Sequence, residues 1–114
     1  DGIWRFCQER DAVSAVSICE VREHPFWMQR CDAAHRLAPF VNGMPSAIRR
    51  QDLPPAYILN GALYLARTDW LLSHKSFITG ETLGYIMPSE RSVDLDSEHD
   101  WRWCEFIINQ MGNI

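Results

Sequence analysis

The segment Ala12–Val21 (AVSAVSICEV) constrains the fold more than any other part of the sequence. If it is a strand, small or β-branched side chains occupy both of its faces, and no charged residue occurs before Glu20. A strand without a polar face must be covered on both sides, which is typical of the sheets of α/β proteins. We therefore expect the rest of the chain to supply layers on both sides of this strand.

The remaining pattern alternates helices with strands. Helices are predicted over Gly2–Arg10 and Ser97–Met111, and strands over Tyr57–Ala66, Leu83–Met87 and Ser92–Leu95. Thr68-Asp69 is expected to cap a further short helix that continues through Trp70. Strands interleaved with helices favour a layered α/β fold over an all-α or all-β fold.

Composition and charge exclude several classes of protein. The 114 residues are 46% hydrophobic and 23% charged, which is typical of one globular domain or a piece of one. The net charge of −4 argues against nucleic-acid binding, and no stretch approaches the ~18 apolar residues of a membrane span. The four cysteines form no Cys-x-x-Cys pair, which argues against a structural zinc site. Without a secretory signal, we expect reduced thiols and a cytoplasmic location.

The stretch Arg22–Pro45 differs from its surroundings. Prolines and an Asn-Gly pair interrupt it and allow only short extended pieces or a hairpin arm. Its apolar content, which includes Phe26-Trp27-Met28 and Phe40-Val41, is high for a loop. The apolar side chains of such a segment need to be shielded from water, and a partner chain could shield them.

The sharpest chemical feature is the run Ser92–Asp96 (SVDLD). In a strand, Asp94 and Asp96 share one face about 6–7 Å apart and repel each other unless a cation lies near them. Oxygen ligands of this kind suit Mg²⁺, which keeps several waters and bridges substrate phosphates. The alternative is that Asp96 or Ser97 caps the last helix, with Asp100 in its first turn and Asp94 solvated.

Other polar and aromatic residues leave two interpretations open. Arg49-Arg50-Gln51 can bind a carboxylate or phosphate, or can form a solvated turn. Asn60-Gly61 can form a type I′ hairpin turn, or Asn60 can begin a strand and present its amide to a ligand. Tyr64 and Phe77 suit a core as well as a ligand contact.

The order of these motifs resembles that of the C-terminal half of the acylneuraminate cytidylyltransferases, the CMP-sialic acid and CMP-legionaminic acid synthetases. The matching motifs are Ser17–Val21, His24–Met28, Arg50–Pro54 with Tyr57, Asn60–Tyr64, Tyr85–Met87, and Arg91–Asp96 with Asp100-Trp101. The resemblance covers nearly the whole chain, and its motifs agree in order and spacing.

The resemblance implies an α/β fold, namely part of a Rossmann-like nucleotide-sugar transferase domain, with residues 1–114 as its C-terminal part. It implies transfer of CMP from CTP to a nonulosonic acid, with Mg²⁺ as cofactor and pyrophosphate as product. Asp94 and Asp96 match the catalytic, metal-binding pair. The residues that match the sugar pocket are Arg50, Asn60, Tyr64 and Phe77, with Gln51 beside them. Residues 22–48 match an arm through which these enzymes form homodimers.

One departure from the family pattern limits the expected activity. Nothing in the chain corresponds to the Gly- and basic-rich loop that holds the CTP phosphates, so we expect the isolated 114 residues to be inactive. We also expect a dimer or strand-exchanged oligomer, because an uncovered strand invites pairing. The alternatives are a non-catalytic dimerising or interaction module, a truncated remnant, and a glycosyltransferase that holds a nucleotide sugar through Asp-x-Asp.

Overall fold

The computed structural model describes residues 1–42 and 52–112, which divide into two compact units. The first, here called the sheet unit, consists of Asp1–Cys19 and Leu59–Ile114. The second, the hairpin unit, is Glu20–Ile58. The predicted cluster Arg49-Arg50-Gln51 lies outside the described residues.

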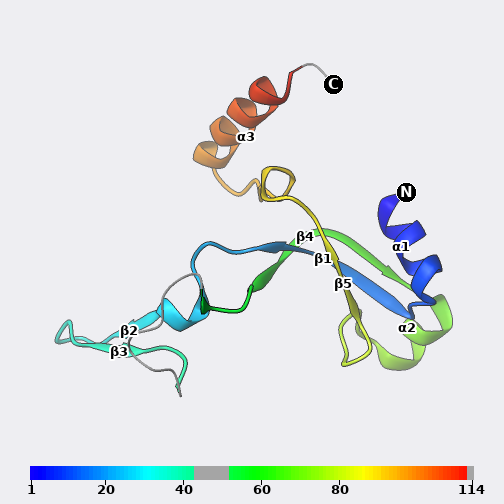
Figure 1. Cartoon of the computed structure of the whole chain (residues 1–114), viewed down its shortest axis with the longest axis horizontal. Coiled ribbons are helices and arrows are strands. Elements are labelled where there is room, and N and C mark those ends of the chain that lie inside the picture. Colours follow the sequence, from blue (N-terminus) through cyan, green and yellow to red (C-terminus); the bar gives the residue numbers. More distant parts are fainter. Residues whose placement is uncertain (43–51, 113–114) are drawn as a thin grey trace. The chain divides into compact units, whose positions relative to one another are not determined.

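A three-stranded sheet organises the sheet unit, and its middle strand is β1 (Ser14–Glu20), as Figure 1 shows. β1 pairs in parallel with β5 (Leu83–Ile86), with Ala15 opposite Leu83. On its other side it pairs with β4 (Tyr57–Ala66). The predicted α/β class is confirmed, and a sheet with helices in the connections is compatible with part of a Rossmann-like domain.

β4 runs antiparallel to β1 and contains a bulge. The backbone bonds near the two ends of the pair run from Arg67 N–H to Val13 O and from Val21 N–H to Ala56 O. The interval along β4 is longer than the interval along β1, so β4 carries extra residues. Gly61, with φ of 72°, provides the left-handed conformation there. The type I′ turn considered for Asn60-Gly61 is therefore wrong, because β4 continues through both residues.

Two helices of the sheet unit agree with the sequence. α1 (Gly2–Arg10) buries Ile3 and places the Phe6 ring edge-on to Tyr85 at 5.4 Å between centroids. α2 (Thr68–His74) buries Trp70. Its predicted cap is wrong: Arg67 is the N-cap residue, and the Asp69 carboxylate instead accepts a hydrogen bond from Trp70 N–H.

The centre of the sheet unit is small and lies along β1. The buried residues are Ile3, Ser14, Ala15, Val16, Ser17, Cys19 and Trp70. Because neighbours along β1 point to opposite faces, burial of both Ala15 and Val16 confirms that this strand is covered on both sides. The buried Ser14 hydroxyl bonds the Thr82 hydroxyl at 2.7 Å, so its burial leaves no unsatisfied group.

The predicted strand Ser92–Leu95 is wrong. A 3₁₀ turn, η3 (Ser89–Arg91), follows β5, and α3 (Glu98–Met111) begins directly after Ser97. The residues between them are an irregular loop, with which no strand in residues 1–42 or 52–112 pairs. Turn η3 and the helix cap hold the two ends of this segment, and without a neighbouring strand among the described residues to pair with, it stays irregular.

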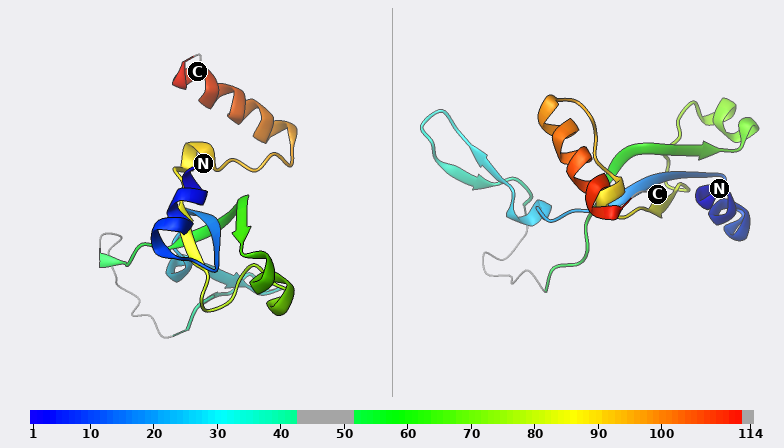
Figure 2. Two further views of the ribbon diagram at one scale, coloured as in Figure 1. Left: turned by 90° about the vertical axis from the view of Figure 1, so that its right-hand side faces the viewer. Right: turned by 90° about the horizontal axis from the view of Figure 1, so that it is seen from above.

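The hairpin unit contains a 3₁₀ turn, η1 (Pro25–Trp27), and two short antiparallel strands, as Figure 2 shows. The strands are β2 (Gln29–Cys31) and β3 (Leu37–Pro39), so the predicted hairpin is confirmed. The Asp32 carboxylate organises the turn by accepting the backbone N–H groups of Ala34 and Arg36 at 2.8 and 2.9 Å. No described residue of this unit is buried.

All four cysteines carry free thiols, of which Cys19 is buried and Cys31 exposed. Cys7 and Cys104 are half-buried. Among the helices that the structure describes, none has the length and apolar character needed to span a bilayer.

Candidate functional site

Asn60, in the bulge of β4, joins three segments of the sheet unit through its side chain. Its Oδ1 accepts hydrogen bonds from the Ser17 hydroxyl at 2.5 Å and from Ala62 N–H at 3.1 Å. Its Nδ2 donates to the Ser92 hydroxyl at 2.9 Å and lies 3.5 Å from Met87 Sδ. The bulge therefore turns this amide toward β1 and toward the chain that leaves β5.

The orientation of the Asn60 amide follows from its partners. A backbone N–H can only donate, so the side-chain atom facing Ala62 must be the carbonyl oxygen. The NH₂ group is then fixed toward Ser92. The Ser92 hydroxyl accepts this bond and donates its own proton to Pro88 O at 2.8 Å.

Asp94 and Asp96 lie in the loop that begins at Ser92, and both are exposed. Although they are not in a strand, their side chains meet. Charge repulsion from the Asp94 carboxylate raises the pKa of Asp96, and a hydrogen bond between the two side chains raises it further. The structure thus brings together the two predicted acidic residues and places Asn60 against the residue from which their loop starts.

The far end of this loop is held by a helix cap. The Ser97 hydroxyl accepts a hydrogen bond from Asp100 N–H at 3.2 Å, and Asp100 Oδ2 accepts from Ser97 N–H and Asp96 N–H at 3.0 and 3.1 Å. Bonds from the Ser97 hydroxyl and then from Asp96 N–H lower the pKa of Asp100. The alternative expectation is confirmed for Ser97 as the cap and is wrong for Asp96, while the exposure of Asp94 agrees with both interpretations of that residue.

The predicted aromatic residues form a pair. The rings of Tyr64, on β4, and Phe77, in the loop after α2, lie 5.4 Å apart at a tilt of 59°. Tyr64 is 47% exposed and Phe77 is half-buried, so the pair lines the surface rather than the centre of the unit. Such a pair can still cover one side of a bound ligand.

The described residues offer two carboxylates but no larger set of metal ligands. Within residues 1–42 and 52–112, no three His, Cys, Asp or Glu side chains come together in a way that could hold a metal ion. Two carboxylates suffice for Mg²⁺ where substrate phosphates and water complete the coordination. The predicted Arg50 and Gln51 fall outside the described part of the chain.

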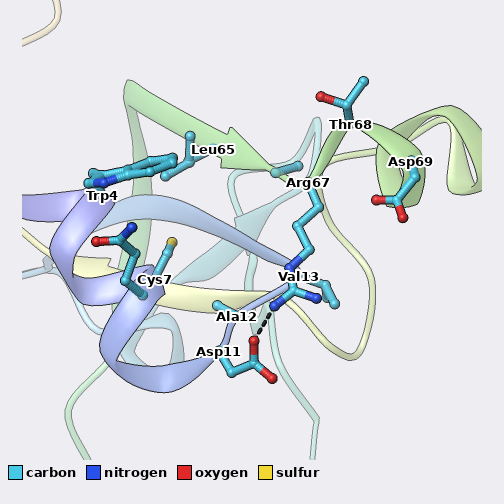
Figure 3. Close-up of a pocket in the computed structure, with 11 residues that line it drawn as sticks. Trp4, Cys7, Asp11, Ala12, Val13, Leu65, Arg67, Thr68 and Asp69 are labelled. Atoms are coloured by element: carbon cyan, nitrogen blue, oxygen red, sulfur yellow. Dashed lines mark hydrogen bonds and ion pairs between the residues drawn. The ribbon is translucent and has the colours of Figure 1, made fainter.

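A cavity of about 660 Å³ lies elsewhere in the sheet unit, between α1, the residues that join α1 to β1, the end of β4 and the start of α2. Figure 3 shows Trp4 and Cys7 on its α1 side and the ion pair between Asp11 and Arg67 across its other end. Burial raises the pKa of the Cys7 thiol. Sequence reasoning missed this cavity because nothing in the local pattern links Asp11 to Arg67. None of the described residues predicted for the site lines it.

Comparison with known proteins finds several relatives. The chain is 33% identical over 97 residues to an N-acylneuraminate cytidylyltransferase of Streptococcus agalactiae serotype III, an alignment covering 84% of this chain and 23% of that protein. It is 33% identical over 60 residues to a CMP-N,N′-diacetyllegionaminic acid synthase of Campylobacter jejuni, covering 53% of this chain and 26% of the relative.

A similar synthase of Legionella pneumophila is 28% identical over 102 residues, which cover 83% of this chain and 41% of that protein. The chain therefore spans less than half the length of each of these relatives. No protein-family model matches it.

Proposed function

We propose that this chain, which belongs to the acylneuraminate cytidylyltransferase family, supplies the acidic pair and part of the sugar pocket of an enzyme that transfers CMP from CTP to a nonulosonic acid. The observation that carries the proposal is the juxtaposition of Asn60 with the loop bearing Asp94 and Asp96. Residues that match two separate family motifs thus meet at one end of the sheet unit.

The acidic pair fits a divalent cation. Asp94 and Asp96 are exposed, and their carboxylates repel each other, so a cation between or near them would relieve the repulsion. Bound there, Mg²⁺ would neutralise charge on the CTP phosphates and on the pyrophosphate that leaves. The role of these two side chains is to hold that charge at a fixed place, and we propose both as catalytic residues.

The sugar side of the proposed site is built from β4 and the loop after α2. Asn60 presents an amide beside the acidic loop, and Tyr64 with Phe77 presents a partly exposed aromatic surface. An aromatic face suits the apolar face of a sugar ring, while Arg50, with Gln51 beside it, would fork onto the sugar carboxylate. Position 50 is proposed from the motif Arg50–Pro54 alone.

We further propose that residues 22–48 form the arm of a homodimer. The described part of this arm exposes apolar side chains, among them Trp27, Leu37 and Phe40, that a monomer would leave in water. Sedimentation velocity should show a dimer that Leu37→Asp dissociates, whereas Ala34→Asp in the hairpin turn serves as a control. A monomer of the unsubstituted chain at high concentration would contradict this part of the proposal.

Calorimetry with Mg²⁺ and a nonulosonic acid tests the sugar site. Tyr64→Ala and Tyr57→Ala are matched variants, because both tyrosines lie on β4 and are 47% and 43% exposed. Loss of sugar binding in Tyr64→Ala alone, and its loss in Arg50→Ala, supports the proposal. Absence of sugar binding by a stable dimer favours a non-catalytic dimerising module instead.

The isolated 114 residues are expected to bind without catalysing. A steady-state assay with CTP, Mg²⁺ and the acid should give no CMP-sugar, because no loop of this chain matches the family's phosphate cradle. Formation of CMP-sugar by this polypeptide would overturn the expectation of inactivity. In a longer protein that includes these residues, Asp94→Asn and Asp96→Asn should abolish turnover and Glu81→Gln should not.

A further inference from the structure

We propose that Ser17 and Ser92 are positioning residues that act through Asn60 to hold the loop of Asp94 and Asp96 in place. This inference rests on the proposed function, because it concerns the loop that would bind the cation. Neither serine carries a charge or belongs to the predicted site. Their importance follows from where their hydroxyl groups lie.

Two hydrogen bonds, Ser17 to Asn60 and Asn60 to Ser92, form a connection from β1 to the acidic loop. Ser17 is the end of this connection that lies in the sheet. It lies in the middle of β1 and is 1% exposed, so its hydroxyl must find partners within the protein. It donates to Asn60 Oδ1 at 2.5 Å and accepts from Leu63 N–H at 2.8 Å. Because these two bonds reach β4 on either side of Gly61, the hydroxyl joins β1 to the bulge at the point where Asn60 turns toward the loop.

Ser92 provides the other end of the connection. It is half-buried and receives the Asn60 NH₂ group at 2.9 Å while donating to Pro88 O at 2.8 Å. Ser92 N–H also bonds Ser89 O at 3.1 Å, so turn η3 and Asn60 hold the same residue. The acidic loop therefore begins at a residue, Ser92, that hydrogen bonds link to the middle strand of the sheet.

The connection and the helix cap lie on either side of the acidic pair. Ser92 precedes Asp94 by two residues, and Asp100 binds the backbone N–H of Asp96. An irregular exposed loop gains little order from its own sequence, so its two ends must fix the carboxylates. Groups that orient ligands from outside the coordination sphere commonly change metal affinity about 10–100-fold when they are removed.

The test compares Ser17→Ala and Ser92→Ala with Ser14→Ala. Ser14 is an apt control because it is also 1% exposed on β1 and hydrogen-bonded, but to Thr82 rather than to Asn60. Backbone ¹⁵N relaxation of residues 93–96 in the metal-free chain measures loop order, and calorimetric titration with Mn²⁺ measures affinity. Ser92→Thr, which keeps the hydroxyl, tests rescue.

The expected result is a lower heteronuclear NOE over residues 93–96 in Ser92→Ala and Ser17→Ala, with wild-type values in Ser14→Ala and Ser92→Thr. Mn²⁺ affinity should fall about tenfold in Ser92→Ala, and in the same direction but less in Ser17→Ala. If Ser17→Ala does not fold, Ser92→Ala decides by the same measurements.

Unchanged loop order in Ser92→Ala overturns the positioning role, whatever the metal titration gives. Equal effects in Ser14→Ala also overturn it, since they would reflect general loss of stability. Failure of the unsubstituted chain to bind Mn²⁺ is a different result: it contradicts the proposed metal site on which the inference rests.

Discussion

Different kinds of interaction stabilise the sheet unit and the hairpin unit internally. In the sheet unit, β1 is covered on both faces, and its buried serines are hydrogen-bonded to residues distant in sequence. In the hairpin unit no described residue is buried, and its turn depends on one carboxylate, that of Asp32. The first unit can position a site through packing, whereas the second offers exposed apolar surface for another molecule.

The largest expected difference between the units concerns tryptophan. Trp70 is 8% exposed and stacks on His74 at 4.4 Å, whereas Trp27 is 43% exposed in the hairpin unit. Trp70→Ala should lower the free energy of unfolding by about 3–5 kcal/mol, and Trp27→Ala by about 0.5 kcal/mol in the monomer. Urea unfolding followed by circular dichroism measures both. Equal losses would show that the units do not differ in this way.

Substitutions at residues with left-handed backbone conformation should give a smaller difference in stability between the two units. Gly61 has φ of 72° in the bulge of β4, and no atom lies within 4 Å of the position of an added Cβ. Gly61→Ala should therefore cost about 1–2 kcal/mol through strain alone. His35 already occupies this region in the hairpin unit, with φ of 63°, so His35→Gly should not destabilise the chain comparably. Thermal unfolding of both variants tests the contrast.

Strong acid should weaken the turn of the hairpin unit. The backbone N–H of Arg36, and then its guanidinium and Ala34 N–H, lower the pKa of Asp32. Because the pKa of Asp32 is lower in the folded state, its ionised carboxylate stabilises the fold fully at pH above the unfolded pKa of ~3.9. This stabilisation is lost as the pH falls through the folded pKa. The Ala34 and Arg36 amide resonances should shift in that range. Asp32→Asn should remove the transition, and a transition that persists in this variant would assign it elsewhere.

The sequence was informative where the pattern depends on neighbouring residues. The two-sided apolar pattern of Ala12–Val21 identified β1, and apolar spacing identified α1 and α3. Proline and Asn-Gly breaks limited Arg22–Pro45 to short extended pieces or a hairpin arm, and the structure forms a hairpin there. These features follow from local burial and backbone preference, so no knowledge of distant contacts was needed.

Distant contacts explain what the sequence could not provide. The bulge at Asn60 depends on the Ser17 hydroxyl, which lies on another strand. The run Ser92–Asp96 alternates polar and apolar residues as a strand does. However, turn η3 ends directly before this run, and Ser97 caps helix α3 directly after it. The roles of the acidic pair, the Tyr64–Phe77 pair and the cluster Arg49-Arg50-Gln51 stay predictions.

The most direct test of the central claim is paramagnetic broadening by Mn²⁺ in amide-detected NMR spectra of the chain. If Asp94 and Asp96 bind the cation, substoichiometric Mn²⁺ should first broaden the amides of residues 93–97 and the side-chain NH₂ of Asn60. Asp96→Asn should remove this pattern and Glu81→Gln should not. Broadening centred on Asp32 or on other carboxylates, with residues 93–97 unaffected, would contradict the account.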